Sequence, residues 1–197
     1  MVIVGAGSLG REILTIMIED GFHDEIVFYD ENSNIPSVLY NKFQVINNSA
    51  SLEKLFLEGD NRFITAVGSP RLREKLTKKI EILGGELSSV ISKRTTIFHF
   101  NKNYIGAIIQ PGVGISYGVE INEGAAIHIN ATIGHNVKIG KYVNIGPNAT
   151  VIGPSSIGDY SYISAQACLL PNIIVGKHVI VSAGKVVDHD LADFEIF

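Results

Sequence analysis

Three glycines near the start of the chain have the spacing of a phosphate-binding loop. Gly5, Gly7 and Gly10 follow an apolar run and precede a segment with helical periodicity. Such glycines let the backbone approach a phosphate, and the following helix offers free N–H groups. Asp30 lies about 20 residues further on, where a carboxylate can accept a hydrogen bond from a ribose hydroxyl or a base N–H. We expect a nucleotide-binding loop formed by Gly5, Gly7, Ser8, Gly10 and Asp30; the alternative is a tight strand-to-helix turn without a ligand.

Histidine supplies the second group of candidates. The chain has six histidines, and His135 stands two residues after Ile133. If Ile133 points into a core, the side chain of His135 points outward, toward solvent or a neighbouring subunit. A neutral imidazole accepts protons near pH 7, so His135 is a candidate general base for an amine or hydroxyl nucleophile. The alternative is an exposed histidine without a chemical role.

The spacing gives little support to a metal centre or to thiol chemistry. Zinc takes three or four well-placed ligands. His99 and His135 are 36 residues apart, His128 and His135 are 7 apart, and no His-x4-His pair occurs. Cys168, the one cysteine, excludes a framework of intrachain disulfides and has no histidine at a motif spacing. We therefore expect no metal.

A six-residue period in the second half of the chain indicates how these groups are positioned. Fourteen successive aliphatic residues stand six apart without a change of register. A helix repeats every ~3.6 residues and a strand every ~2, so this period predicts a solenoid of short strands joined by tight corners. Nearby glycines and asparagines suit corners with positive φ. The fourteen residues are Ile109, Ile115, Ile121, Ile127, Ile133, Ile139, Ile145, Val151, Ile157, Ile163, Leu169, Val175, Val181 and Val187.

The first half of the chain has a different organisation, in which strands alternate with helices. This alternation predicts a small, Rossmann-like parallel α/β sheet. The segment is too short for a dinucleotide fold with two halves, which favours a mononucleotide-type ligand. We expect strands at residues 1–4, 25–29 and 63–67, helices at 11–20, 52–57 and 69–83, and domains at 1–90 and 91–197.

The composition is that of an ordinary globular protein. The chain has 197 residues, of which 46% are hydrophobic and 18% charged, and its net charge is −4. This charge gives no argument for binding to nucleic acid or to an anionic membrane surface. Neither a signal-peptide pattern nor a run of ~20 apolar residues occurs, so we expect no membrane insertion and a cytoplasmic location.

Short motifs spread over the whole chain resemble those of one protein family. They are residues 2–7 with Gly10, Arg11 and Glu12, residues 28–31, residues 63–68 with Arg71, and the repeats at 133–140 and 179–187. With them the chain resembles the bacterial sugar acetyltransferases with hexapeptide repeats, similar to sialic-acid O-acetyltransferase and the UDP-4-amino-sugar N-acetyltransferases. The resemblance implies a left-handed parallel β-helix after the Rossmann-like domain. It also implies an acetyl-CoA donor, a nucleotide-linked sugar held by the N-terminal domain, and a homotrimer with sites between neighbouring β-helices.

The resemblance further assigns roles to individual residues. His135 occupies the place of the general base, and Asn136 stands where the family often has a carboxylate that orients the ring. Gly153, eighteen residues after His135, occupies the place whose backbone N–H binds the thioester oxygen in a tetrahedral intermediate. His128 and Asn144 stand at polar positions that are expected to contact the sugar. Gly153, Ser164, Ala165, Ala183 and Lys185 are expected to line the path of the acyl donor.

Two alternatives to an acetyltransferase stay open. Some relatives with these repeats are γ-type carbonic anhydrases, whose histidine spacing this chain lacks. The departures at Asn136 and His128 leave room for a non-catalytic trimeric scaffold or a nucleotide-sugar-binding protein. Residues 188–197 are expected to form an acidic cap over the last repeat, in which Asp188, His189 and Asp190 are solvated.

Overall fold

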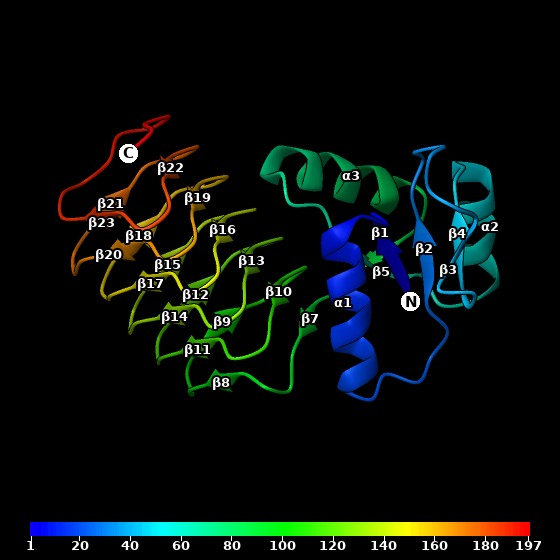
Figure 1. The fold of residues 1–197 in the computed structure, drawn as a ribbon, viewed down its shortest axis with the longest axis horizontal. Helices are drawn as coiled ribbons and strands as arrows, with labels where there is room; N and C mark the ends of the chain where they lie inside the picture. The colour runs from blue at the N-terminus through cyan, green and yellow to red at the C-terminus, as the bar shows by residue number, and fades with distance from the viewer. The chain divides into compact units, whose positions relative to one another are not determined.

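The chain forms two compact units, one with helices around a sheet and one made of short strands (Figure 1). The computed structural model describes all of residues 1–197 and divides them into Met1–Ser88 and Ser89–Phe197. This division falls two residues before the boundary that we expect from the sequence. The structure contains no helix with the length and apolar character needed to cross a membrane.

The first unit is a six-stranded sheet with helices on both faces. The strand order is β3-β4-β2-β1-β5-β6, and all neighbouring strands are parallel except β3 and β4. Val2 and Val4 pack with α2 and α3, whereas Ile3 faces the start of α1, because side chains alternate along a strand. The elements are β1 (Val2–Val4), α1 (Ser8–Glu19), β2 (Val27–Tyr29), β3 (Val38–Leu39), β4 (Phe43–Ile46), α2 (Ser49–Glu58), β5 (Arg62–Thr65), α3 (Pro70–Ile82) and β6 (Glu86–Leu87).

The predicted alternation of strands and helices is confirmed, and the sheet has three further strands. The expected elements are present as β1, α1, β2, α2, β5 and α3. The sequence does not predict β3, β4 and β6, because β3 and β6 have only two residues each and the apolar residues of β4 are interrupted by Gln44. α1 begins at Ser8, three residues before the predicted start, since Gly7 serves as its N-cap. α3 ends at Ile82, one residue before the predicted end, and Gly84 with a φ of 92° stops the helix.

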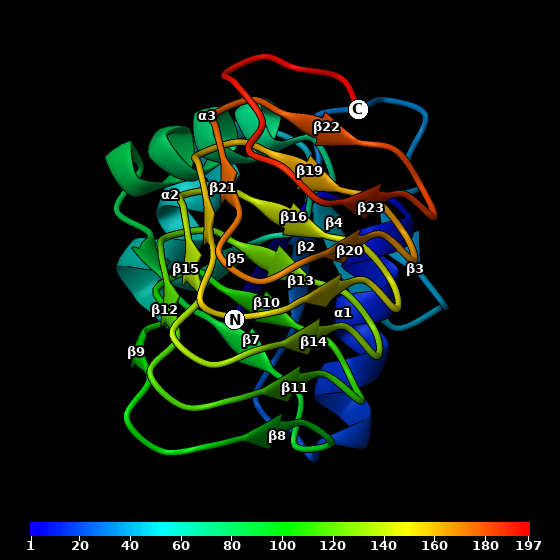
Figure 2. The ribbon, with the colours of Figure 1, turned by 90° about the vertical axis from the view of Figure 1, so that its left-hand side faces the viewer.

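The second unit is a left-handed parallel β-helix with three strands in each full coil (Figure 2). Strands of one sheet pair in register at an interval of 18 residues, as in the pairing of Ile115 with Ile133 and of Ile133 with Val151. We name the three sheets face 1, face 2 and face 3. Face 1 contains β7 (Val90–Ile91), β10 (Ile108–Ile109), β13 (Ala126–Ile127), β16 (Asn144–Ile145), β19 (Tyr162–Ile163) and β22 (Ile180–Val181). Face 2 contains β8 (Thr96–Ile97), β11 (Gly114–Ile115), β14 (Thr132–Ile133), β17 (Thr150–Val151), β20 (Cys168–Leu169) and β23 (Val186–Val187), and face 3 contains β9 (Lys102–Asn103), β12 (Glu120–Ile121), β15 (Lys138–Ile139), β18 (Ser156–Ile157) and β21 (Ile174–Val175).

The six-residue period corresponds to one continuous core inside the β-helix. Each of the fourteen aliphatic residues is at most 3% exposed, so the predicted inward orientation is confirmed. The corners between strands take the left-handed backbone conformation. Gly112 and Asn130 have φ values of 74° and 58° at one corner, as glycine and asparagine readily do.

Aromatic side chains take this strained conformation along the corner between face 3 and face 1. Tyr142 and Tyr160 have φ values of 55° and 61°. Because each coil repeats after 18 residues, side chains at one corner lie above one another, and these rings stack. Ring centroids are 6.0 Å apart for Tyr142 and Tyr160, and 4.8 Å apart both for Tyr160 and His178 and for His178 and Phe194. A neighbouring column of charged side chains alternates in sign: Glu123, Lys141, Asp159 and Lys177.

The C-terminal segment covers the last strands of face 1 and face 3. Leu191 pairs with Val175, and Ile196 pairs with Ile180. Asp190 accepts a hydrogen bond from the Ile174 N–H at 2.7 Å, so this carboxylate caps the edge of β21. The segment thus forms the acidic cap expected from the sequence, but Asp190 is part of the cap and is not simply solvated.

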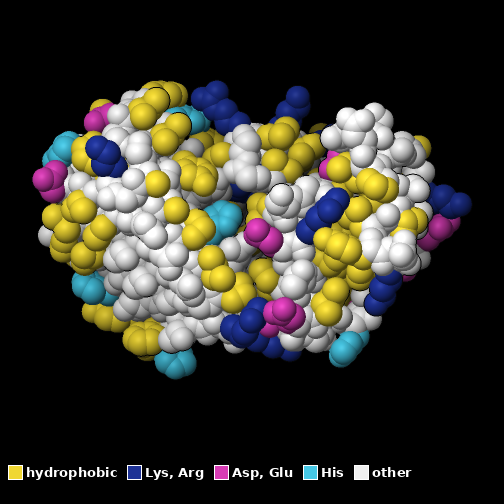
Figure 3. All heavy atoms as spheres, viewed as in Figure 1, with side chains coloured by type: hydrophobic (Ala, Val, Ile, Leu, Met, Phe, Trp, Pro, Cys, Tyr) yellow, Lys and Arg dark blue, Asp and Glu magenta, His cyan; other side chains and the backbone are white.

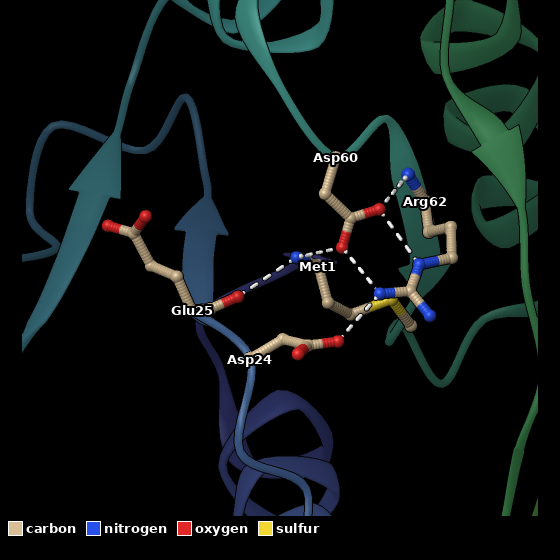
Figure 4. Close-up of polar contacts among 5 residues, drawn as sticks. All are labelled: Met1, Asp24, Glu25, Asp60 and Arg62. Carbon is tan, nitrogen blue, oxygen red and sulfur yellow. Dashed lines mark hydrogen bonds and ion pairs between the residues drawn. The ribbon is translucent and has the colours of Figure 1, made fainter.

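A cluster of charged groups joins β1, β2 and β5 at one end of the first sheet (Figure 4). Asp60 accepts hydrogen bonds from the Arg62 guanidinium at 2.8 Å and from the amino group of Met1 at 2.9 Å. Arg62 also donates to the exposed Asp24 at 2.9 Å, and the Met1 amino group donates to the Glu25 carbonyl oxygen at 2.9 Å. The Arg62 hydrogen bonds, aided by the Met1 amino group, hold the pKa of Asp60 well below its usual range.

Asp60→Asn is expected to lower the melting temperature at pH 7 by about 2–4 °C, the shift that corresponds to ~1 kcal/mol in a chain of this size. A carboxyl whose pKa is lower in the folded state stabilises the fold above the unfolded pKa of ~3.9 and loses this effect as the pH falls. The difference between the two proteins should therefore shrink in melts below about pH 3. Asp24→Asn is the matched control, because Asp24 is exposed and contacts Arg62 alone. An unchanged difference at low pH would contradict the assignment.

Candidate functional site

His135 lies at the corner between face 2 and face 3, two residues after the end of β14. Its ring is half-buried and stacks on the ring of Tyr117, with 5.6 Å between centroids and 12° between planes. Tyr117 is 18 residues earlier and therefore occupies the same corner one coil before. Tyr117 is absent from the candidates predicted from the sequence, although a step of one 18-residue coil back from His135 leads to it.

Asn136 contacts the ring of His135, as expected for a residue that orients it. The Asn136 amide nitrogen lies 3.4 Å from Nδ1 of His135. In this orientation the amide donates to Nδ1, and the neutral ring carries its proton on Nε2. A half-turn of the amide places its oxygen there instead, which fixes the proton on Nδ1 and leaves the Nε2 lone pair free. An arrangement in which the amide accepts from the imidazole N–H, as a carboxylate at this place would, thus needs this half-turn.

Gly153 lies directly against the backbone of His135, one coil further on. A Cβ atom added to Gly153 would be 1.7 Å from the His135 carbonyl oxygen, so no other residue fits without a backbone shift. The Gly153 N–H donates to no acceptor within the chain. The corner therefore holds a ring, an amide and an unused backbone donor within two successive coils.

His128 and Asn144 lie on face 1 and do not meet His135 within one chain. His128 follows β13, and Asn144 is the first residue of the adjacent β16. Face 2 separates them from the corner that carries His135 and Gly153. Both residues expected to contact the sugar thus lie on face 1, away from the corner that carries His135, and Asn144 is buried there.

The residues expected to line the path of the acetyl-CoA donor lie at the two edges of face 2. Ser164, Ala165, Ala183 and Lys185 follow β19 and β22 at the corner between face 1 and face 2, and Gly153 is at its other edge. Ala165 and Ala183 add little bulk, which leaves room for an extended chain beside this corner. Lys185 lies over the ring of Phe197, with 5.5 Å from Nζ to the centroid.

Between these two corners, the outer surface of face 2 has almost no charge (Figure 3). Face 3, in contrast, presents Lys102, Glu120 and Lys138 on its outer surface. The first charged side chain on face 2 is Asp188, after its last strand. The outward residues before it are Thr96, Phe98, Gly114, Ser116, Thr132, Gly134, Thr150, Ile152, Cys168, Leu170 and Val186.

The glycine loop of the first unit has the close contacts that its spacing predicts. Gly5 has a φ of 104°, and its N–H donates to the Tyr29 carbonyl oxygen at 2.8 Å. A Cβ on Gly10 would lie 2.0 Å from the Gly5 carbonyl oxygen, so this glycine is needed for the turn itself. Gly7 has open space around it and forms the N-cap of α1, where a ligand can approach the backbone. Ser8 is exposed in the first turn of the helix.

Asp30 holds the glycine loop and lines a cleft beside it. Its carboxylate accepts hydrogen bonds from the Ala6 N–H at 2.8 Å and the Asn32 N–H at 2.9 Å. The cleft has a volume of about 260 Å³ and is also lined by Gly5, Tyr29 and Leu72, among others. Asp30 therefore has a structural role that the sequence does not reveal, in addition to any contact with a ligand.

Glu31, beside Asp30, belongs to a polar cluster that the sequence does not predict. The Glu31 carboxylate accepts hydrogen bonds from Lys79 at 2.6 Å and from the Tyr29 hydroxyl at 2.7 Å. The Lys79 ammonium lowers the pKa of Glu31, and burial raises the pKa of Tyr29. Lys79 belongs to α3, far from Glu31 in the sequence, so no local pattern predicts this contact.

No group of three or more His, Cys, Asp or Glu side chains is placed to hold a metal ion. His99 and His135 occupy the same corner two coils apart, and Tyr117 occupies this corner in the coil between them. Cys168 lies on face 2 as a free thiol.

Comparisons with known proteins match both units. Residues 1–80 match the family described as PglD N-terminal domain, and residues 118–153 match the bacterial transferase hexapeptide with six repeats. The chain is 28% identical to GDP-perosamine N-acetyltransferase of Escherichia coli O157:H7 over 187 residues, which cover 92% of this chain and 82% of the relative.

Solved structures of sugar acetyltransferases have the same fold. A point mutant of perosamine N-acetyltransferase from Caulobacter crescentus, in complex with CoA and GDP-perosamine, matches with a TM-score of 0.89 and 26% identity over 99% of this chain and 91% of that one. The acetyltransferase domain of PglB from Neisseria gonorrhoeae FA1090, in complex with acetyl coenzyme A, matches with a TM-score of 0.90 and 27% identity over 99% and 93% of the two chains.

Gly153→Ala is expected to destabilise the β-helix, because the new methyl group overlaps the His135 backbone. Overpacking of this kind costs roughly 1–3 kcal/mol, or several degrees in a thermal melt. Gly114→Ala is the matched control, since nothing lies within 4 Å of the position of its Cβ. Equal melting temperatures for the two variants would show that the corner does not have this close contact.

Proposed function

Because this chain belongs to the bacterial sugar acetyltransferases with hexapeptide repeats, enzymes that use acetyl-CoA, we propose that it acetylates a nucleotide-linked amino sugar with His135 as general base. The observation that carries the proposal is the corner at which His135, Asn136 and the unused N–H of Gly153 lie together on successive coils. The non-catalytic scaffold has no comparable support from the relatives.

In the proposed reaction, His135 removes a proton from the sugar amine as the amine nitrogen attacks the carbonyl carbon of the acetyl thioester. The new carbon–nitrogen bond gives a tetrahedral intermediate, which collapses as the carbon–sulfur bond breaks and His135 returns the proton to the departing sulfur of CoA. The reaction is then balanced without a nucleophilic side chain, so it gives the free thiol of Cys168 no role. General bases of this kind contribute ~10²–10⁴-fold to a rate.

Gly153 is proposed to donate its N–H to the carbonyl oxygen while negative charge develops there. A backbone donor without a partner in the chain needs no rearrangement at the moment of reaction. The acetyl-CoA donor would extend from this glycine toward Ser164, Ala165, Ala183 and Lys185 on the opposite edge of face 2. The small side chains at that corner fit an extended arm, and Lys185 provides a cation for a phosphate.

We further propose a homotrimer in which face 2 is the surface that meets a second copy. Its outer surface is almost uncharged, which makes desolvation inexpensive, whereas face 3 carries charges in successive coils. His128 on face 1, with the buried Asn144 beside it on the adjacent strand, would then complete a site that contains His135 of another copy. Within one chain these residues are separated, so the proposed sugar contacts depend on the trimer.

The first unit is proposed to hold the nucleotide of the acceptor through Gly5, Gly7, Ser8, Gly10 and the cleft beside Asp30. A GDP-linked 4-amino sugar is the first acceptor to test, because perosamine N-acetyltransferases are among the relatives. We propose that the reaction takes place in the cytoplasm, where acetyl-CoA is available.

The expected result for the wild-type protein is release of CoA thiol from acetyl-CoA with one member of a panel of GDP-, UDP- and dTDP-linked amino sugars and sialic acids. His135→Ala should lower kcat by roughly 10²–10⁴-fold with little change in KM, because it removes only the proton transfer. Light scattering should give the same mass for both proteins. Nucleotide-sugar binding without thiol release from the wild type would favour the binding-protein alternative, and an active His135→Ala would refute the role of the histidine.

Asn136→Asp should increase kcat by roughly 3–10-fold, because a hydrogen bond to a charged group is about twice as strong as one between neutral groups. A carboxylate only accepts, so it fixes the proton on Nδ1 of His135 and leaves Nε2 free to act as base. The φ of 55° at this position is accessible to aspartate. Thiol release under saturating substrate provides the measurement, and a decrease in kcat would show that the amide is the better partner in this protein.

A further inference from the structure

Tyr117 contacts His135 through the face of its ring. The stack has 5.6 Å between centroids and 12° between planes, a geometry in the range of attractive offset pairs. The backbone reinforces it, since the Asn136 N–H donates to the Tyr117 carbonyl oxygen at 3.0 Å. The two rings therefore belong to coils that are hydrogen-bonded to one another at this corner.

The two sides of the imidazole have different surroundings. Tyr117 covers one face, whereas the next coil has Gly153, which has no side chain. A histidine at an exposed corner otherwise has several rotamers, and a single neutral amide at 3.4 Å is a weak constraint on the ring. Tyr117 restricts rotation of the ring plane while the opposite side stays open to a reactant.

We propose that Tyr117 is a positioning residue that fixes the ring plane of His135 and, through its π face, attracts the imidazolium formed when His135 takes a proton. This inference rests on the proposed function, in which His135 is the base. A carboxylate neighbour would attract the imidazolium by charge, which the neutral Asn136 cannot do. The electron-rich face of a tyrosine ring provides a similar, weaker attraction.

The chain contains a matched control for this stack. Tyr160 stacks on His178, which is also 18 residues later, with 4.8 Å between centroids and 5° between planes. This pair lies at the corner between face 3 and face 1, away from His135. Tyr160→Leu thus removes stacking contacts of the same kind, with Tyr142 as well as with His178, from the same fold and leaves Tyr117 and His135 in place.

The first experiment measures the stack without any substrate. In proteins with isotope-labelled histidine, the ring-proton signals of His135 are assigned by their absence in His135→Ala. The expected result is an upfield ring-current shift of these signals in the wild type and Tyr117→Phe, which Tyr117→Leu loses and Tyr160→Leu retains. Identical His135 signals in the wild type and Tyr117→Leu would overturn the proposal, whether or not the protein acetylates a sugar.

The second experiment measures kcat and KM for thiol release with the best acceptor of the panel. Tyr117→Leu should lower kcat by roughly three- to tenfold with KM unchanged, the effect expected from loss of one aromatic contact in the transition state. Tyr117→Phe should restore kcat, because the ring face and not the hydroxyl acts. Equal losses in Tyr117→Leu and Tyr160→Leu would indicate general loosening and overturn the proposal, as would a Tyr117→Phe as slow as Tyr117→Leu. Absence of turnover in the wild type would refute the proposed function instead, while the ring-current result still decides whether the stack exists.

Discussion

The in-register pairing of coils every 18 residues is the constraint on which the β-helix depends. Each strand has only two residues, so a coil has no stability of its own and its N–H groups bond to the next coil. Every side chain therefore lies above and below its equivalents from neighbouring coils. The inward aliphatic residues of successive coils therefore form one core, and the outward residues of one column have similar surroundings.

The same constraint explains how a few residues at one corner can act together. Tyr117, His135 and Gly153 are far apart along the chain but adjacent in the structure, because each is one coil from the next. The absence of a side chain at Gly153 is as important as the presence of the two rings, since it leaves space and an unused N–H beside the imidazole. At the corner between face 3 and face 1 the same stacking yields only a structural ladder of rings and charges.

The first unit depends on a different principle, in which polar groups fix the ends of a parallel sheet. At one end Asp60 is bonded to Arg62 and to the amino group of Met1. At the other end the Asp30 carboxylate accepts a hydrogen bond from the Ala6 N–H of the glycine loop, and the Glu31 carboxylate forms an ion pair with Lys79. Acidic side chains at the cleft therefore have partners within the unit, which limits the negative charge that a nucleotide phosphate would meet.

The sequence by itself determined the β-helix, the Rossmann-like unit and the closeness of His135 to Gly153, because a fixed period and the glycine spacing are local patterns. It did not reveal β3 and β6, which have only two residues each, or β4, whose apolar residues are interrupted by Gln44. Nor did it reveal the Glu31–Lys79 pair, whose partners are distant in the chain. Only the tertiary structure decided how the amide of Asn136 faces His135, and that the ring of Tyr117 lies flat against the imidazole. Side-chain orientation at a corner depends on the neighbouring coils, and only the assembled coils determine it.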